Sequence, residues 1–175
     1  MECTIGDIIA LIALIFGAIG GCFAYLKWRK QTRVRYSEFV RDLIKSMRSD
    51  LENRETFYLI EYGNFKYSKA FHESEDEKKI DKLLTDYNYF CYLYMKSVIK
   101  KDEFGYVKYQ IYRTLSNKHI QNYLFNIFHF SYLTQKEKDD TFSFTYLLRY
   151  GVREGIINEN IYESNNGDYM HVLIA

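Results

Sequence analysis

The stretch IIALIALIFGAIGGCFAYL, residues 8–26, carries no charge and is followed at once by a cluster of basic residues. An α-helix rises ~1.5 Å per residue, so about 20 apolar residues cross the ~30 Å hydrocarbon core of a bilayer. The stretch therefore predicts a transmembrane helix. Because the basic residues lie on its carboxyl side, the positive-inside rule places residues 1–7 outside and the rest of the chain in the cytoplasm. The expected localisation is the inner membrane, with a single pass. The basic cluster comprises Lys27, Arg29, Lys30, Arg33 and Arg35.

A cleaved signal peptide and a buried soluble helix are the alternatives to a membrane helix. A signal peptide has its basic residues before the apolar run and small residues at a cleavage site after it, whereas here the basic residues follow the run. A buried soluble helix rarely extends this far without a charged residue. Both alternatives fit the sequence less well than a transmembrane helix.

Small residues recur every four positions within this stretch, at Ala13, Gly17 and Gly21. Such a ridge lets two helix backbones approach closely, which favours association of helices in lipid. We therefore expect a homo-oligomer held through these three residues. The alternative is that glycine is simply frequent in membrane helices.

The remainder of the chain, residues 36–175, is long enough for one domain with its own core. The chain contains no proline, and no Gly/Ser-rich linker marks a second boundary. The predicted organisation is a leader (1–7), a transmembrane helix (8–26), a basic juxtamembrane segment (27–35) and a cytosolic domain (36–175). Apolar spacing predicts helices over 75–100, 106–115, 118–133 and 141–153, and one over 55–71 that is interrupted at Gly63.

The tail from residue 156 carries an Asn-Asn-Gly turn signal at 165–167, and residues 169–174 are compatible with a short strand. The predicted fold class is therefore mainly α. It consists of one N-terminal transmembrane helix followed by a compact helical cytosolic domain, with a short C-terminal β-hairpin as an option.

The charge balance limits what the domain can bind. Residues 36–175 hold 19 basic and 21 acidic side chains, whereas a domain that binds duplex nucleic acid is usually strongly basic. Duplex nucleic acid is therefore not an expected partner, but a small anionic ligand needs only a local basic patch. The cysteines Cys3, Cys22 and Cys91 have no metal-ligand spacing and indicate no disulfide framework.

No motif of a known catalytic or metal site occurs in the chain. There is no HExxH, GxSxG, phosphate-binding loop or dinucleotide fingerprint. Of the four histidines, His72 is expected to be solvated and His129 to be a hydrogen-bonded core residue. We therefore expect no enzyme activity, no catalytic residue, no metal and no cofactor.

The segment from Lys96 to Tyr123 is locally basic, with six basic against two acidic side chains, and tyrosines lie between the cations. Lysine and arginine bind phosphates, and aromatic rings stack on bases. An ordinary helix surface over a core is the alternative interpretation. The predicted ligand-binding residues are Lys100, Lys101, Lys108, Tyr109, Arg113, Asn117, Lys118 and His119.

A short leader, a Gly-rich helix with Gly17, Gly20 and Gly21, a basic stop and a helical domain together resemble small membrane effectors of prokaryotic antiviral defence. The layout is most similar to the membrane-anchored ancillary proteins of type III CRISPR systems. That resemblance implies a cytosolic domain that senses a cyclic oligoadenylate and an oligomeric anchor that perturbs the lipid bilayer. The expected function is thus a non-enzymatic effector with a cyclic oligonucleotide as its ligand. The alternative is a membrane-tethered adaptor that binds another protein and no nucleotide.

Overall fold

The structure, a computed structural model, describes residues 5–135, 142–164 and 167–170, with only the backbone for residues 5, 7–13 and 131–135. The described chain is mainly helical, which confirms the mainly-α prediction, and no strand occurs among these residues. The helices are α1 (Ile5–Ser49), α2 (Leu51–Glu61), α3 (Glu75–Met95), α4 (Lys101–Leu115), α5 (Lys118–Gln135) and α6 (Thr145–Arg153), with 3₁₀ turns η1 (Lys69–Phe71) and η3 (Glu159–Tyr162).

The predicted transmembrane helix over 8–26 is contradicted. Where the structure describes side chains, none of its helices has both the length and the apolar character needed to cross a membrane. Within the predicted span this part comprises Leu14–Leu26, whose thirteen residues rise about 20 Å against a core of ~30 Å. Beyond Leu26 the same helix α1 continues through the basic cluster to Ser49. The single-pass inner-membrane localisation, which rested on that helix, is overturned with it.

The predicted C-terminal hairpin is also absent from the described part of the tail. The side chain of Asn158 accepts a hydrogen bond from the Asn160 backbone N–H at 3.1 Å and begins η3. The ring of Tyr169 stacks on Phe125 of α5, with centroids 4.6 Å apart and ring planes 10° apart. Tyr169 therefore packs against a helix rather than pairing with a strand. Residues 171–174 of the predicted strand lie outside the described residues.

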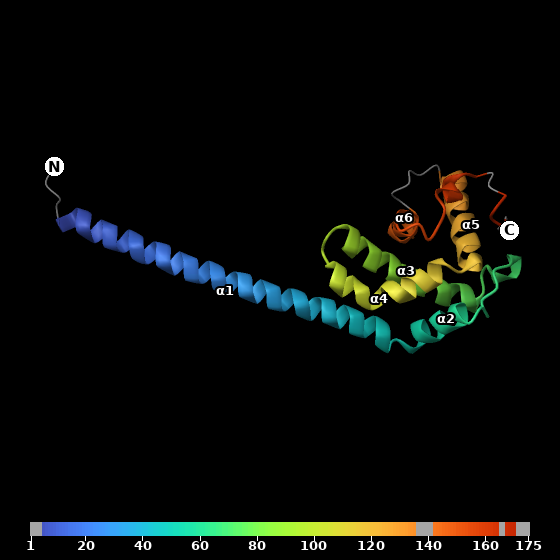
Figure 1. Cartoon of the computed structure of the whole chain (residues 1–175), viewed down its shortest axis with the longest axis horizontal. Coiled ribbons are helices and arrows are strands. Elements are labelled where there is room, and N and C mark those ends of the chain that lie inside the picture. Colours follow the sequence, from blue (N-terminus) through green and yellow to red (C-terminus); the bar gives the residue numbers. More distant parts are fainter. Residues whose placement is uncertain (1–4, 136–141, 165–166, 171–175) are drawn as a thin grey trace. The chain divides into compact units, whose positions relative to one another are not determined.

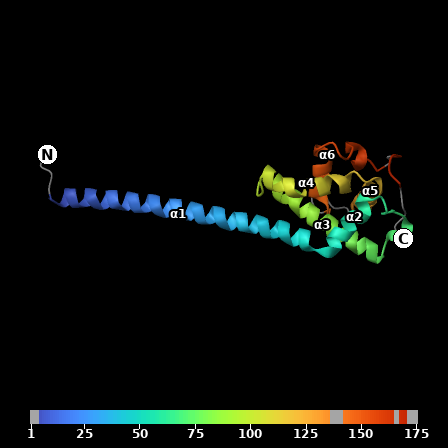
Figure 2. The same ribbon diagram turned by 60° about the horizontal axis from the view of Figure 1, so that its bottom comes forward.

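The chain divides into two compact units, residues 1–43 and 44–175. The first unit is the greater part of α1, the long blue helix of Figure 1. The second unit gathers α2 to α6 into one body, which both Figure 1 and Figure 2 show. Within it, α3 packs against α2, α4 and α6, so α3 organises the core.

Local signals set where α3 begins and where it ends. The Ser74 hydroxyl accepts from the Glu77 N–H at 3.1 Å and caps the amino end of α3. Helix α3 ends at Met95, five residues before the predicted end, because Ser97 adopts a positive φ of 56° and the Val98 N–H turns back to the Leu93 carbonyl at 2.8 Å. The chain then enters α4 at Lys101 rather than at residue 106.

Helix α2 ends at Glu61, close to the break predicted at Gly63, whose φ of +72° favours glycine. It begins at Leu51, four residues earlier than predicted, because the Asp50 carboxylate accepts from the Asn53 N–H at 3.1 Å and caps it. Asp50 itself is extended, with φ −68° and ψ 110°, and so separates α2 from α1.

Helix α6 approaches the end of α4 closely at Gly151. A Cβ at this position would lie 2.8 Å from Ile157 Cδ1 and 3.1 Å from Leu115 Cδ1. Both of these side chains are buried and packed. The absence of a side chain at Gly151 therefore sets the distance between α6 and its neighbours.

We expect Gly151→Val to lower the free energy of unfolding by about 1–3 kcal/mol, because the added methyl groups overpack this contact. The matched control is Gly105→Ala in α4. A Cβ at Gly105 would meet no atom within 4 Å, so this change should raise the free energy of unfolding by about 0.5–1 kcal/mol through helix propensity. Urea unfolding followed by circular dichroism measures both. Equal responses of the two variants would contradict the close contact.

Candidate functional site

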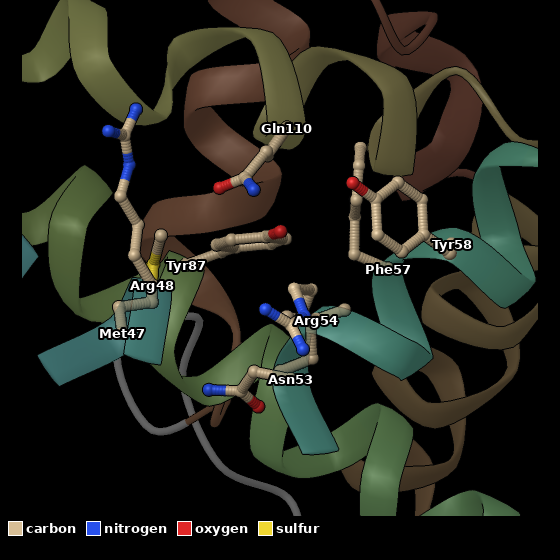
Figure 3. A pocket seen from close by; sticks show the side chains of 9 residues that line it. Met47, Arg48, Asn53, Arg54, Phe57, Tyr58, Tyr87 and Gln110 are labelled. Atoms are coloured by element: carbon tan, nitrogen blue, oxygen red, sulfur yellow. The ribbon is translucent and has the colours of Figure 1, made fainter. Parts of the chain in front are cut away.

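A pocket of about 250 Å³ lies within the second unit, where the last turn of α1 meets α2, α3 and α4. Figure 3 shows Gln110 reaching toward it from α4, Asn53 and Arg54 from α2, and the ring of Tyr87 between them. Its walls are apolar or aromatic with a few polar groups, as in small-molecule sites. The lining residues are Met47, Arg48, Asn53, Arg54, Phe57, Tyr58, Leu83, Tyr87 and Gln110.

Two arginines line this pocket, and no acidic residue does. Arg48 donates from Nη2 to the Tyr106 carbonyl at 3.1 Å and lies 5.8 Å from the centroid of the Tyr106 ring. Arg54 forms no ion pair with any carboxylate among the described residues. Both guanidinium groups thus keep their positive charge available for an anion.

The carboxylates near the pocket already have other partners. Lys82 of α3 takes two of them, with its Nζ 2.8 Å from Asp50 Oδ2 and 2.7 Å from Glu52 Oε2. Asp86 Oδ2 accepts from Asn53 Nδ2 at 2.6 Å. None of these three carboxylates therefore forms an ion pair with Arg54.

Two amide oxygens at the pocket accept no hydrogen bond in the described part of the chain. Asn53 is only 2% exposed, and its Oδ1 is buried without a donor. Because Asn53 Nδ2 donates to Asp86, the orientation of the amide is fixed and Oδ1 is an acceptor. Gln110 Oε1 is likewise buried without a donor. A buried acceptor without a donor costs about 1–3 kcal/mol, which a ligand with N–H or O–H groups would recover.

Aromatic side chains complete the walls. Tyr87 is 1% exposed, and burial raises the pKa of its phenol, so it remains protonated at neutral pH. Tyr58 is 43% exposed, and one face of its ring is stacked on Tyr62. The pocket thus combines two cations, two acceptors and flat aromatic surface, an arrangement that suits a small anion bearing hydrogen-bond donors.

The ligand patch predicted from the sequence is divided by the fold. Lys108 lies 3.5 Å from Glu154 Oε2 at the end of α6. Arg113 Nε lies 3.7 Å from Glu61 Oε1, to which Tyr109 also donates at 2.5 Å. Lys108 thus faces α6, whereas Tyr109 and Arg113 face α2, and each cation already has a carboxylate.

Asn117 and His119 have structural hydrogen bonds. Asn117 Oδ1 accepts from the His119 N–H at 2.9 Å at the start of α5, and Asn117 Nδ2 donates to the Ile60 carbonyl at 3.2 Å. His119 Nδ1 accepts from the Tyr67 N–H at 3.3 Å, and burial holds the pKa of His119 below its ordinary value. Asn117 therefore ties the start of α5 to α2, and His119 ties it to the segment that follows α2.

Lys118 lies apart, with its Nζ 4.5 Å from the Tyr169 ring centroid, in a separate hollow of about 520 Å³. Lys100 and Lys101 are exposed at the beginning of α4. The eight predicted residues thus lie in several places and form no common site in the structure. Their role in ligand binding stays a prediction.

The predicted oligomerisation ridge lies on α1. A Cβ at Gly17 or at Gly21 would meet no atom within 4 Å, so both glycines are accessible to a second helix. The side chain of Ala13 is outside the described part. Self-association through this ridge stays a prediction.

A half-buried polar network lies before and within α3. His72 contacts the Tyr67 hydroxyl through Nε2 and Glu77 Oε1 through Nδ1, both at 2.9 Å. Tyr123 of α5 donates to Asp81 Oδ1 at 2.6 Å. His72 is therefore not the solvated residue that its acidic neighbours in sequence suggested. The network joins α3, α5 and the segment after α2.

No group of three or more His, Cys, Asp or Glu side chains that could hold a metal ion occurs in the described part of the chain. Comparison of the chain with protein-family models, with curated proteins and with solved structures found no match. The geometry of the pocket is accordingly the basis for the functional argument.

The sequence patterns do not indicate the pocket residues Arg48, Asn53, Arg54, Tyr58 and Gln110. One signal was present, because Arg54 and Tyr58 are four residues apart, the spacing of neighbours on one helix face. The convergence of α1, α2, α3 and α4 on one point depends on tertiary packing. No local pattern contains that information.

The half-buried network predicts a pH dependence of stability. Burial raises the pKa of Asp81 above its ordinary value, although the hydrogen bond from Tyr123 opposes this. The pKa of Asp81 is therefore higher in the folded than in the unfolded protein. Above the folded pKa the ionised carboxylate lowers the stability of the fold, and this penalty is lost as the pH falls through the folded pKa toward the unfolded value of 3.8. Asp81→Asn keeps an acceptor for Tyr123 and removes the charge. We expect this variant to melt above wild type at pH 7, with the difference vanishing near pH 4.

Thermal unfolding of both proteins between pH 4 and pH 8 measures this difference. Asp76→Asn, at an exposed position in the first turn of α3, controls for the loss of one negative charge from this helix. A wild type that is more stable than Asp81→Asn at pH 7 would contradict the assignment.

Proposed function

We propose that the domain of residues 44–175 is a non-enzymatic receptor for a small phosphate-bearing ligand, which binds in the pocket between α2 and α4. The proposal keeps the expectation of an anionic ligand and moves the site from the sequence-predicted patch to the pocket. A phosphate suits the guanidinium groups of Arg48 and Arg54, which bind phosphate oxygens in a planar fork. The membrane effect expected from the sequence is not part of this proposal.

The observation that carries the proposal is the buried acceptor of Asn53 beside an arginine without an ion-pair partner. Asn53 Oδ1 and Gln110 Oε1 lack donors, and Arg54 lacks a carboxylate, all among the described residues around one pocket. An anion alone would satisfy only the arginines, and a neutral donor only the amides. A ligand that carries both a phosphate and N–H or O–H groups satisfies all of them.

The size of the pocket limits the ligand. Its volume of about 250 Å³ is below the ~300–1,000 Å³ typical of pockets for drug-sized molecules. A single sugar phosphate or one nucleotide unit is of suitable size. A cyclic oligonucleotide, the ligand expected from the sequence, would place one of its units in each pocket, so a ring would favour an assembly of several chains.

Binding of the proposed ligand would act by stabilising one arrangement of the four helices at the pocket. The equilibrium can shift only as far as the ligand prefers that arrangement over others. The last turn of α1 belongs to the pocket through Met47 and Arg48. Ligand binding would therefore rigidify the corner between α1 and α2.

Arg54→Gln is expected to weaken binding of ribose 5-phosphate by roughly tenfold or more, because a charge-assisted hydrogen bond in a half-enclosed site is lost. The matched control is Arg113→Gln, which removes the same charge where Glu61 already neutralises it. Isothermal titration calorimetry of the full chain measures both variants, and the affinity of wild type should fall as salt rises.

The two variants also distinguish the pocket from the sequence-predicted patch. Loss of binding in Arg113→Gln with full binding in Arg54→Gln would place the site on the patch. Absence of binding by wild type, together with co-purification of a stoichiometric protein, would favour the adaptor function instead.

A further inference from the structure

Two exposed tyrosines, Tyr58 of α2 and Tyr62 directly after it, form a row with Arg54. Arg54, Tyr58 and Tyr62 are each four residues apart, so their side chains are neighbours along one face. The rings of Tyr58 and Tyr62 are stacked, with centroids 5.6 Å apart and planes 9° apart. Tyr62 therefore covers the face of Tyr58 that points along the helix toward its carboxyl end.

The face of the Tyr58 ring opposite Tyr62 is not part of that stack, and the ring lines the same pocket as Arg54. Tyr58 lines the pocket and remains 43% exposed, and Figure 3 shows it rising with Phe57 from α2 beside the pocket. The stack on Tyr62 and the tilted contact with Phe57, at 5.6 Å and 51°, hold the ring in place. A flat group can therefore bind to this face without first ordering the side chain.

We propose that Tyr58 stacks a nucleobase, so that the ligand of the pocket is a nucleotide. This inference rests on the proposed function, because the phosphate of the same molecule is bound by Arg54 and Arg48. Residues four apart on a helix are separated by about 6 Å along the axis, a gap that the sugar between base and phosphate bridges. Base–aromatic stacking tolerates any base, because every base has a flat π face.

The acceptors at the pocket serve the donors of such a ligand. Nucleotides offer sugar hydroxyls and base N–H groups, and Asn53 Oδ1 and Gln110 Oε1 each lack a donor among the described residues. A sugar phosphate would use the arginines and the amides and would leave the face of Tyr58 without a partner. Tyr58 is thus the residue that separates nucleotides from other phosphates.

Calorimetric titration of the full chain with adenosine 5′-monophosphate, uridine 5′-monophosphate and ribose 5-phosphate tests the inference. Wild type should bind both nucleotides about tenfold or more tightly than the sugar phosphate. Tyr58→Ala should lower the affinity for both nucleotides to about that for ribose 5-phosphate, so that the preference for nucleotides is lost. Tyr58→Trp keeps a stacking surface and should keep the preference.

Tyr112→Ala is the matched control, because Tyr112 is 50% exposed on α4 and does not line the pocket. Tyr58→Leu fills the volume without a π face and should behave like the alanine variant, which separates stacking from packing. Circular dichroism confirms that each variant has the helicity of wild type.

The outcomes separate the two proposals. Equal affinity of wild type for ribose 5-phosphate and for nucleotides, with loss of both in Arg54→Gln, overturns base stacking and leaves the phosphate site standing. A nucleotide preference that survives in Tyr58→Ala and Tyr58→Leu also overturns stacking on Tyr58. Absence of binding for all three probes overturns both.

Discussion

The carboxylate of Asp50 holds the corner on which the candidate site depends. Its Oδ1 caps α2 by accepting from the Asn53 N–H at 3.1 Å, and its Oδ2 lies 2.8 Å from Lys82 Nζ on α3. The hydrogen bond from Lys82 holds the pKa of Asp50 below its ordinary value, so the carboxylate is charged at neutral pH. Asp50 thus separates α1 from α2 by its extended backbone, and its side chain caps α2 and ties α2 to α3. The contribution of Asp50 to stability is present above its unfolded pKa and is lost as pH falls through the folded one.

The chemistry of the pocket follows from how this corner distributes its charges. Lys82 binds both Asp50 and Glu52, and Asp86 orients the Asn53 amide. Arg54, the next residue of α2, has no ion pair with a carboxylate among the described residues, and Asn53 Oδ1 is buried without a donor. A domain that is nearly neutral as a whole therefore has a small region where positive charge is uncompensated. Such a region suits one phosphate and not a duplex, which needs many phosphate contacts.

The sequence was sufficient for the helices and insufficient for the site, because the two depend on different ranges of interaction. The break at Gly63 and the apolar periodicity of α3 to α5 are local, and each was predicted close to its observed place. The ligand patch was predicted by counting charges along the chain. That count could not include the partners of Lys108 and Arg113, since Glu154 and Glu61 lie far away in the sequence. The apolar character of residues 8–26 likewise supported a transmembrane helix that the described part of α1 contradicts.

The tyrosines show why composition alone does not identify a binding site. Tyr123 is buried with its hydroxyl on Asp81, and Tyr109 is exposed but shares Glu61 with Arg113, so both have their polar groups satisfied by the fold. Tyr58 differs because its neighbour in the row, Arg54, has no carboxylate partner among the described residues, and because Tyr58 itself lines a pocket. A ligand can gain free energy only from groups that the fold has left without partners. Among the residues that line the pocket, Tyr58 and Arg54 combine an exposed ring with a cation that has no ion-pair partner in the described part of the chain, and a nucleotide can use both.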